Sequence, residues 1–126
     1  MRQGELRGLE VLVVEDDPLV AFDLEDLLGE LGCVALGPAG SIARALARLE
    51  ESRPDLALLD VELGGTRAAP VAAALAAAGV PFALVTGYPP TALVEPPFAG
   101  APLLPKPYTL DDLRRVLLGL AGAARP

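Results

Sequence analysis

Two hydrophobic patterns alternate along the chain. Mainly apolar runs cover residues 9–14, 33–36, 56–60, 81–86 and 101–104. Short continuous runs of this kind, bounded by glycine, proline or acidic residues, are typical of strands buried on both faces of a parallel sheet. The sequence therefore predicts five such strands.

Segments with helical spacing of apolar residues lie between and after these runs. The first begins at Asp17 and Pro18, which suit a helix N-cap and a first helical turn, and Gly32 ends it. Ser41 and Thr109 are predicted to cap two further helices, and an alanine-rich helix is predicted around residues 71–78.

The region from residue 89 to residue 97 breaks this alternation. It contains four prolines, which leave room for only one or two helical turns around residues 91–95. The fourth helix is therefore predicted to be short or disordered.

Five strands alternating with five helical segments predict an α/β fold. We expect a flavodoxin-like, doubly wound, five-stranded parallel sheet of order 2-1-3-4-5 with helices on both faces. The predicted organisation is one domain over residues 9–121, an N-terminal tail at 1–8, a C-terminal tail at 122–126, and no output domain.

Carboxylates follow two strands that this order makes neighbours. Glu15 and Asp16 come directly after the first strand, and Asp60 ends the third. Ligand sites in such sheets lie outside the carboxyl ends of the strands, so these three side chains should converge. Converging carboxylates repel one another unless a cation is present, and oxygen ligands of this kind suit Mg²⁺.

Asp60 is the expected nucleophile, because a carboxylate beside bound Mg²⁺ can attack phosphorus and form an acyl phosphate. The transferred group needs fixed donors for its oxygens. Thr86, at the end of the fourth strand, offers a hydroxyl, and Lys106, after the fifth, offers a compact charge. Lys106 is the only lysine beside nine arginines, which favours a specific role for it.

Composition narrows the function classes. The formal net charge of −7 argues against direct binding of nucleic acid, and the absence of histidine excludes imidazole catalysis. Cys33 is the single cysteine and is expected in the core. The N-terminus lacks the apolar stretch of a signal peptide, and prolines and Gly79 divide the uncharged segment between Arg67 and Glu95, so we expect a cytoplasmic protein without membrane insertion.

Four stretches resemble the motifs of bacterial response-regulator receiver domains. They are residues 11–18 (Val-Leu-Val-Val-Glu-Asp-Asp-Pro), 58–60 (Leu-Leu-Asp), 85–87 (Val-Thr-Gly) and 104–108 (Leu-Pro-Lys-Pro-Tyr). They occur in the family's order and span nearly the whole chain. Together they are specific, whereas each alone would be weak.

The resemblance implies a role for each matched position. Asp60 would accept a phosphoryl group from the phosphohistidine of a histidine kinase or phosphotransfer protein. Glu15, Asp16, Asp60 and the backbone carbonyl of Glu62 would hold Mg²⁺. Thr86 and Lys106 would contact the phosphoryl oxygens. The protein would then signal to a downstream protein target, with no enzyme activity beyond its own phosphorylation and dephosphorylation.

Two departures from typical receivers affect the expected switch. Leu103 occupies the strand-five position where typical receivers carry an aromatic residue, and the proline-rich stretch replaces a normal fourth helix. With residues 81–88 (Pro-Phe-Ala-Leu-Val-Thr-Gly-Tyr), these features are similar to an atypical receiver subgroup with a Phe-Ala-Thr-Gly-aromatic motif. Tyr88 is therefore a possible switch residue, and both a monomer and a weak dimer stay open.

Two other functions fit parts of the sequence. Residues 60–66 superficially resemble the nucleophile motif of haloacid-dehalogenase-like phosphatases, although those enzymes carry it on the first strand, with an aspartate where Glu62 stands. The other alternative is an interaction module that works without phosphorylation.

Overall fold

The structure, a computed structural model, describes residues 5–124 of the chain. Its main sheet is parallel and has the order β2-β1-β3-β6-β7, which is the predicted 2-1-3-4-5 order once a small hairpin is counted separately. The strands are β1 (Glu10–Val14), β2 (Val34–Ala39), β3 (Leu56–Asp60), β6 (Phe82–Thr86) and β7 (Leu103–Pro105).

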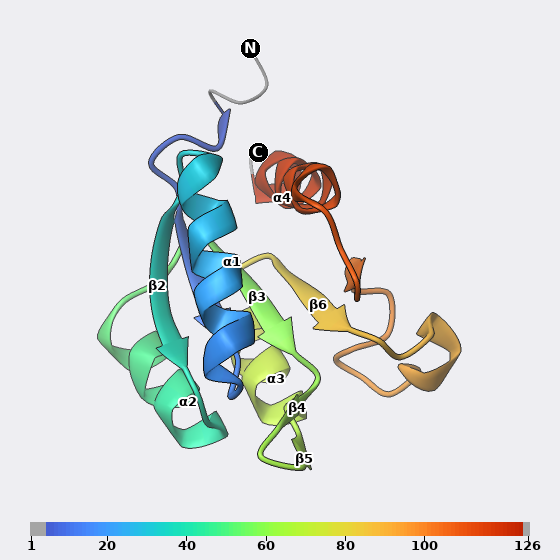
Figure 1. Ribbon diagram of the computed structural model, residues 1–126. Helices are drawn as coiled ribbons and strands as arrows, with labels where there is room; N and C mark the ends of the chain where they lie inside the picture. Colours follow the sequence, from blue (N-terminus) through green and yellow to red (C-terminus); the bar gives the residue numbers. More distant parts are fainter. Residues whose placement is uncertain (1–4, 125–126) are drawn as a thin grey trace.

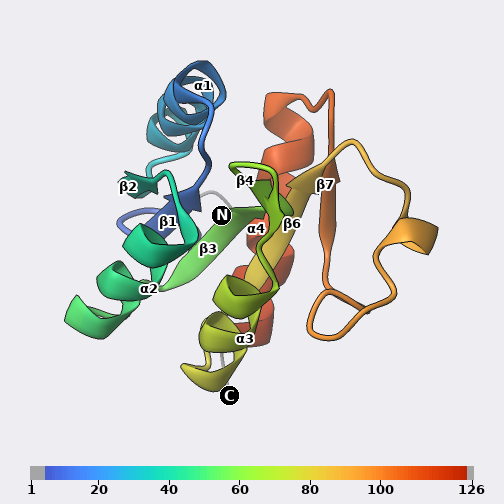
Figure 2. The same ribbon diagram turned by 90° about the horizontal axis from the view of Figure 1, so that it is seen from below.

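Helices cover both faces of the sheet. One face carries α1 (Pro18–Glu30) and α4 (Leu110–Ala124), and the other carries α2 (Ile42–Glu51) and α3 (Ala69–Ala77), as Figures 1 and 2 show. The flavodoxin-like doubly wound fold predicted from the sequence is therefore confirmed.

The apolar run of β3 supplies both cores. Leu56 and Leu58 face α1 and α4, while Ala57 and Leu59 belong to the core under α2 and α3. All four side chains are essentially inaccessible to solvent. A strand that is apolar on both faces is thus explained by two helical layers.

The second strand is longer than predicted. We expected it to close at Leu36, but β2 continues through Gly37 to Ala39. Gly37 makes this possible because its φ is +99°, and a Cβ there would lie 2.9 Å from the carbonyl oxygen of Val13. The register with β1 shifts at this place.

A hairpin follows Asp60 that the pattern of apolar runs does not predict. It consists of β4 (Glu62–Leu63) and β5 (Thr66–Arg67), paired antiparallel. Gly64 and Gly65 form the turn with φ values of +59° and +81°. Positive φ at both central residues is the geometry that matches the twist of a two-residue hairpin.

The connection between β6 and β7 is irregular apart from one 3-10 turn, η2 (Pro90–Ala92). The short fourth helix is therefore confirmed. Leu93 and Phe98 are buried and anchor the connection against α3's side of the sheet. Figure 1 shows the segment extending beyond the end of β6.

Both predicted tails include ordered residues. Leu6 is fully buried, and its carbonyl oxygen lies 3.5 Å from the Sγ of Cys33, which is itself buried as expected. The last helix runs to Ala124, past the expected boundary at residue 121. Residues 1–4 and 125–126 lie outside the described part. Within residues 5–124, none of the helices combines the length and apolar character needed to cross a membrane.

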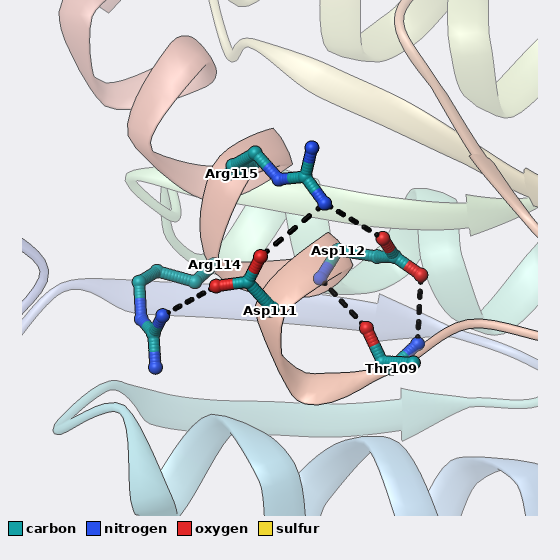
Figure 3. A network of polar contacts seen from close by, with 5 residues as sticks. All are labelled: Thr109, Asp111, Asp112, Arg114 and Arg115. Carbon is teal, nitrogen blue, oxygen red and sulfur yellow. Dashed lines mark hydrogen bonds and ion pairs between the residues drawn. The ribbon is translucent and has the colours of Figure 1, made fainter.

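Reciprocal hydrogen bonds cap the start of α4 (Figure 3). Thr109 accepts a bond from the amide of Asp112, and Asp112 accepts one from the amide of Thr109. These bonds lower the pKa of the Asp112 carboxyl. Arg114 pairs with Asp111, and Arg115 pairs with both Asp111 and Asp112. The predicted cap at Thr109 is confirmed.

Candidate functional site

Three carboxylates meet at one edge of the sheet. Glu15 and Asp16 follow β1 directly, and Asp60 is the last residue of the adjacent strand β3. Carboxylate oxygens of the three residues lie within 4.8 Å of one another. The convergence predicted from the strand order is therefore present.

Glu15 is the buried member of this cluster. Its Oε2 accepts a hydrogen bond of 3.0 Å from the amide of Asp17, while its Oε1 is buried and has no hydrogen-bond partner among the described residues. Burial, with a smaller contribution from the charge of Asp60, raises the pKa of Glu15 to about 7. A buried carboxylate oxygen is thus held beside Asp60 without a donor.

The hairpin after Asp60 closes over the other two carboxylates. The Oδ1 of Asp60 accepts a bond of 3.2 Å from the amide of Glu62, and the Oδ2 of Asp16 accepts one of 2.8 Å from the amide of Gly64. The sequence does not predict the second contact, because the paired glycines at 64 and 65 indicate a turn but not the residue that the turn will contact. The chain around Asp60 is therefore tied to the end of β1.

Lys106 joins the cluster from the far strand. Its Nζ lies 3.8 Å from the Oε1 of Glu15, too far for a hydrogen bond but close enough for charge attraction. The backbone amide of Lys106 donates to the carbonyl oxygen of Thr86, which fixes the loop after β7 against the end of β6. The predicted positive charge is thus present at the site.

Thr86 is buried at the end of β6, next to β3, so the structure places it at the same sheet edge. Its Oγ1 accepts a hydrogen bond of 3.0 Å from the amide of Tyr88. The Tyr88 hydroxyl donates to the Oε1 of Glu62 at 3.2 Å. Tyr88 therefore links the loop after Thr86 to the hairpin after Asp60.

Leu103, at the position of the usual strand-five aromatic residue, begins β7 and is packed against the core under α2 and α3. Tyr88 instead is exposed over 43% of its surface. An aromatic side chain is thus available beside Thr86, and an aliphatic one on β7.

The donor set fits a hard divalent cation. Mg²⁺ prefers oxygen ligands and is usually held by one or two carboxylates together with water. Glu15, Asp16 and Asp60 supply such oxygens, and the unpartnered Oε1 of Glu15 is one of them. A ligand role for the Glu62 carbonyl stays a prediction.

The fold and the site define a doubly wound α/β protein whose acidic cluster occupies the switch point between β1 and β3. The sequence matches the profile of the response regulator receiver domain over residues 11–117. The chain belongs to this family, which acts in two-component signalling, and this agrees with the receiver motifs rather than with the phosphatase alternative.

Two curated relatives agree with this family assignment. It is 36% identical over 115 residues to the phyllosphere-induced regulator PhyR of Methylorubrum extorquens, covering 86% of this chain and 42% of that protein. It is 33% identical to the transcriptional regulatory protein PdtaR of Mycobacterium tuberculosis, covering 82% of this chain and 52% of PdtaR. The chain thus spans about half the length of these relatives.

A solved structure matches over nearly its full length. SdrG of Sphingomonas melonis superposes with a TM-score of 0.78 at 42% identity, covering 90% of this chain and 96% of SdrG. The likeness over nearly the whole of SdrG supports the same fold and family assignment.

Proposed function

We propose that the chain is a phosphoacceptor response regulator: Asp60 accepts a phosphoryl group from the phosphohistidine of a histidine kinase or phosphotransfer protein. The observation that carries this proposal is the convergence of Glu15, Asp16 and Asp60 at the ends of β1 and β3, with Lys106 3.8 Å from Glu15. Family membership supports the same function.

The reaction exchanges one phosphorus bond for another. An Asp60 carboxylate oxygen attacks phosphorus, the bond between phosphorus and the donor imidazole nitrogen breaks, and its electron pair returns to that nitrogen. The product is an acyl phosphate on Asp60. The hydrogen bond from the Glu62 amide to Oδ1 of Asp60 leaves the other oxygen, Oδ2, as the natural nucleophile.

Glu15 and Asp16, with Asp60 and the Glu62 carbonyl, would hold Mg²⁺. The bound ion would neutralise charge that builds up on the phosphoryl oxygens. Burial of Glu15 makes its ionisation costly, and a nearby cation reverses that cost. Binding of the metal at these residues would therefore favour attack by the Asp60 carboxylate.

Lys106 and Thr86 would bind the transferred group. Lys106 supplies a point charge on a flexible side chain that is partly exposed and can turn from Glu15 toward a new anion. Thr86 would supply its hydroxyl by giving up the contact with the Tyr88 amide. Each movement draws the end of β6 or β7 toward Asp60.

The surface beside the site suits a protein phosphodonor. A cavity of about 370 Å³ opens between α1 and the loop after β7, and it is lined by Leu19, Val20, Asp23, Lys106, Pro107 and Tyr108. Leu19 and Phe22 on α1 are 81% and 70% exposed. We propose that this cavity beside Lys106, with the exposed apolar side chains of α1, forms the docking surface for the phosphodonor.

The proposed output is a population switch. Phosphorylation adds charge and acceptor oxygens at Asp60, and the irregular segment at residues 89–97 changes its packing and meets a downstream protein. A solved structure of the relative SdrG, 41% identical to this chain, is described as its BeF3-activated conformation. We also propose that the chain has no activity on other substrates and that it acts in the cytoplasm.

Labelling with acetyl phosphate tests the proposal. The wild-type chain should form one acyl phosphate per molecule in the presence of Mg²⁺ and almost none with EDTA. Asp60→Asn should abolish labelling, and Asp55→Asn, at the opposite end of β3, is the matched control that should label normally. Intact-mass spectrometry and Phos-tag gels, both with unheated samples, measure the product.

Two results would contradict the proposal. Labelling that persists in Asp60→Asn would move the acceptor elsewhere, and absence of labelling in the wild-type chain would favour the phosphorylation-independent interaction module. Multiple turnover of a small phosphomonoester would instead indicate a phosphatase.

A further inference from the structure

Arg67 links the hairpin that follows Asp60 to the segment that follows Thr86. Its guanidinium lies over the Tyr88 ring, 5.5 Å from the ring centroid. Its Nη2 donates to the carbonyl oxygen of Ala92 at 3.4 Å and lies 3.5 Å from the Oε1 of Glu95. One side chain on β5 therefore contacts the irregular segment at three places between residues 88 and 95.

Glu62 adds a second contact to Tyr88. Glu62 and Arg67 are directly opposite each other in the β4–β5 pair, so their side chains are neighbours. Glu62 accepts the hydrogen bond of the Tyr88 hydroxyl, and Arg67 covers the ring. The hairpin thus holds Tyr88 by its polar tip and by its aromatic face.

The contacts that hold Tyr88 also affect Thr86, because the backbone amide of Tyr88 is hydrogen-bonded to the Thr86 side chain. The Tyr88 amide donates to the Oγ1 of Thr86. If that hydroxyl turns toward a phosphoryl group on Asp60, the bond is lost. Contacts that fix Tyr88 therefore stabilise the present rotamer of Thr86.

The Arg67 guanidinium is not fully satisfied in this arrangement. Its Nη1 is buried and has no hydrogen-bond acceptor within residues 5–124. A buried charged donor without an acceptor carries a free-energy cost. That cost reduces the free-energy difference between this arrangement and one in which the Arg67 side chain no longer contacts residues 88–95.

We propose that Arg67 is a positioning residue that holds residues 88–95 against the β4–β5 hairpin and thereby keeps Thr86 turned away from Asp60 in the resting state. The inference rests on the proposed function, because it concerns the regulation of phosphorylation at Asp60. A lysine at position 67 retains the charge but not the planar fork and ring contact, so it replaces arginine only in part.

The expected effect is moderate. The side chains of Arg67 and Glu95 are 37% and 40% exposed, and ion pairs at such positions are weak. Together with the ring contact and the bond to Ala92, we expect loss of Arg67 to shift the population of the released arrangement about two- to fivefold.

Amide hydrogen exchange tests whether Arg67 holds residues 88–95 against the hairpin, and it needs no phosphodonor. The amides of Ala92 and Leu93 donate within the 3-10 turn η2, and they should exchange about two- to fivefold faster in Arg67→Gln. Glu95→Gln should show a smaller increase, and Arg67→Lys should lie between wild type and Arg67→Gln. Arg115→Gln removes an exposed arginine on α4 and should leave these amides unchanged.

Acetyl phosphate labelling tests the coupling to Asp60. Arg67→Gln should label about two- to fivefold faster than wild type in Mg²⁺, with the same order among the variants as in the exchange experiment. Unchanged exchange in Arg67→Gln would overturn the inference, and so would faster exchange with unchanged labelling. Failure of the wild-type chain to label overturns the proposed function, while the exchange measurement still decides whether Arg67 holds the segment.

Discussion

The two halves of the sheet present their site residues in different ways. Strands β1 and β3 deliver Glu15, Asp16 and Asp60 from regular structure, with Asp17 capping the helix that follows β1. Strands β6 and β7 deliver Thr86 and Lys106 from either side of an irregular connection. The half of the sheet with β1 and β3, which carries the carboxylates, is therefore regular and is called the rigid half. The half with β6 and β7, which would contact a bound phosphoryl group, has an irregular connection that can change its conformation.

Physical reasons support this division. Carboxylates that repel one another stay together only on a frame that cannot relax, and close-packed parallel strands provide it. Under the proposed function, the side chains of Thr86 and Lys106 would turn toward a phosphoryl group on Asp60. A connection with few regular hydrogen bonds opens at low free-energy cost.

Truncation of one buried leucine in each half gives the largest expected effect. Leu59 in β3 and Leu93 after η2 are both buried in the core under α2 and α3. Leu59→Ala should lower the free energy of unfolding by about 3–4 kcal/mol, because the sheet cannot collapse around the cavity. Leu93→Ala should cost only about 1–2 kcal/mol, because the irregular segment can close over it. Urea unfolding measures both.

Equal losses for the two leucine variants would contradict the comparison. They would mean that residues 87–102 are as rigid as the sheet. Leu59→Met, which nearly conserves volume, is the control and should cost less than about 1.5 kcal/mol.

The pH dependence of the free energy of unfolding should show the cost of ionising the buried Glu15 in the rigid half. In the folded chain the pKa of Glu15 is about 7, against an ordinary value of 4.5. The folded state therefore binds the proton more tightly, and stability should fall as pH rises from about 4.5 to 7, by at most about 3 kcal/mol. Glu15→Gln should remove this fall. Urea unfolding in EDTA across that range measures it.

Added Mg²⁺ supplies the matching test. If Glu15, Asp16 and Asp60 bind the ion, Mg²⁺ should reduce the loss of stability between pH 4.5 and 7 in the wild-type chain. Glu15→Gln, which should show no such loss in EDTA, should show none in Mg²⁺ either. A wild-type curve parallel to that of Glu15→Gln in EDTA would show that Glu15 ionises without cost.

Sequence alone predicted the rigid half closely. The apolar runs of β1 and β3 and the strand order placed Glu15, Asp16 and Asp60 together, because parallel strands end at one edge. These arguments depend on patterns that repeat along the whole chain, and the packing of the core enforces them.

Other features depended on contacts that no local pattern specifies. The hairpin at 62–67 arises from the positive φ of Gly64 and Gly65, and the amide of Gly64 reaches Asp16 only in the folded chain. The contacts of Arg67 join residues 21 to 28 positions apart across an irregular segment, and such pairings follow no period. The burial of Leu6 was missed because a single apolar residue in a polar stretch gives no periodic signal.

A glycine-to-alanine substitution in each half compares a position where a Cβ would clash with one where it would meet no other atom. Gly37 in β2 has a φ of +99°, and a Cβ there would lie 2.8 Å from the amide nitrogen of Ala39. Gly37→Ala should cost about 2 kcal/mol, because the backbone or its neighbour has to shift. Nothing lies within 4 Å of a Cβ at Gly87, so Gly87→Ala should change stability by less than about 1 kcal/mol. Thermal unfolding compares them, and a loss in Gly87→Ala as large as in Gly37→Ala would refute the contrast.

Helix caps should give the smallest effect, and an equal one in both halves. Asp17 accepts from the amide of Leu19 at the start of α1, and Thr109 accepts from the amide of Asp112 at the start of α4. Asp17→Ala and Thr109→Ala should each lower the free energy of unfolding by about 1 kcal/mol, because a cap acts on its own helical turn alone. Urea unfolding measures both, and Asp17→Asn and Thr109→Ser should retain most of the stability. A Thr109→Ala cost far below that of Asp17→Ala would mean that the adaptable region extends beyond residues 87–102 into α4.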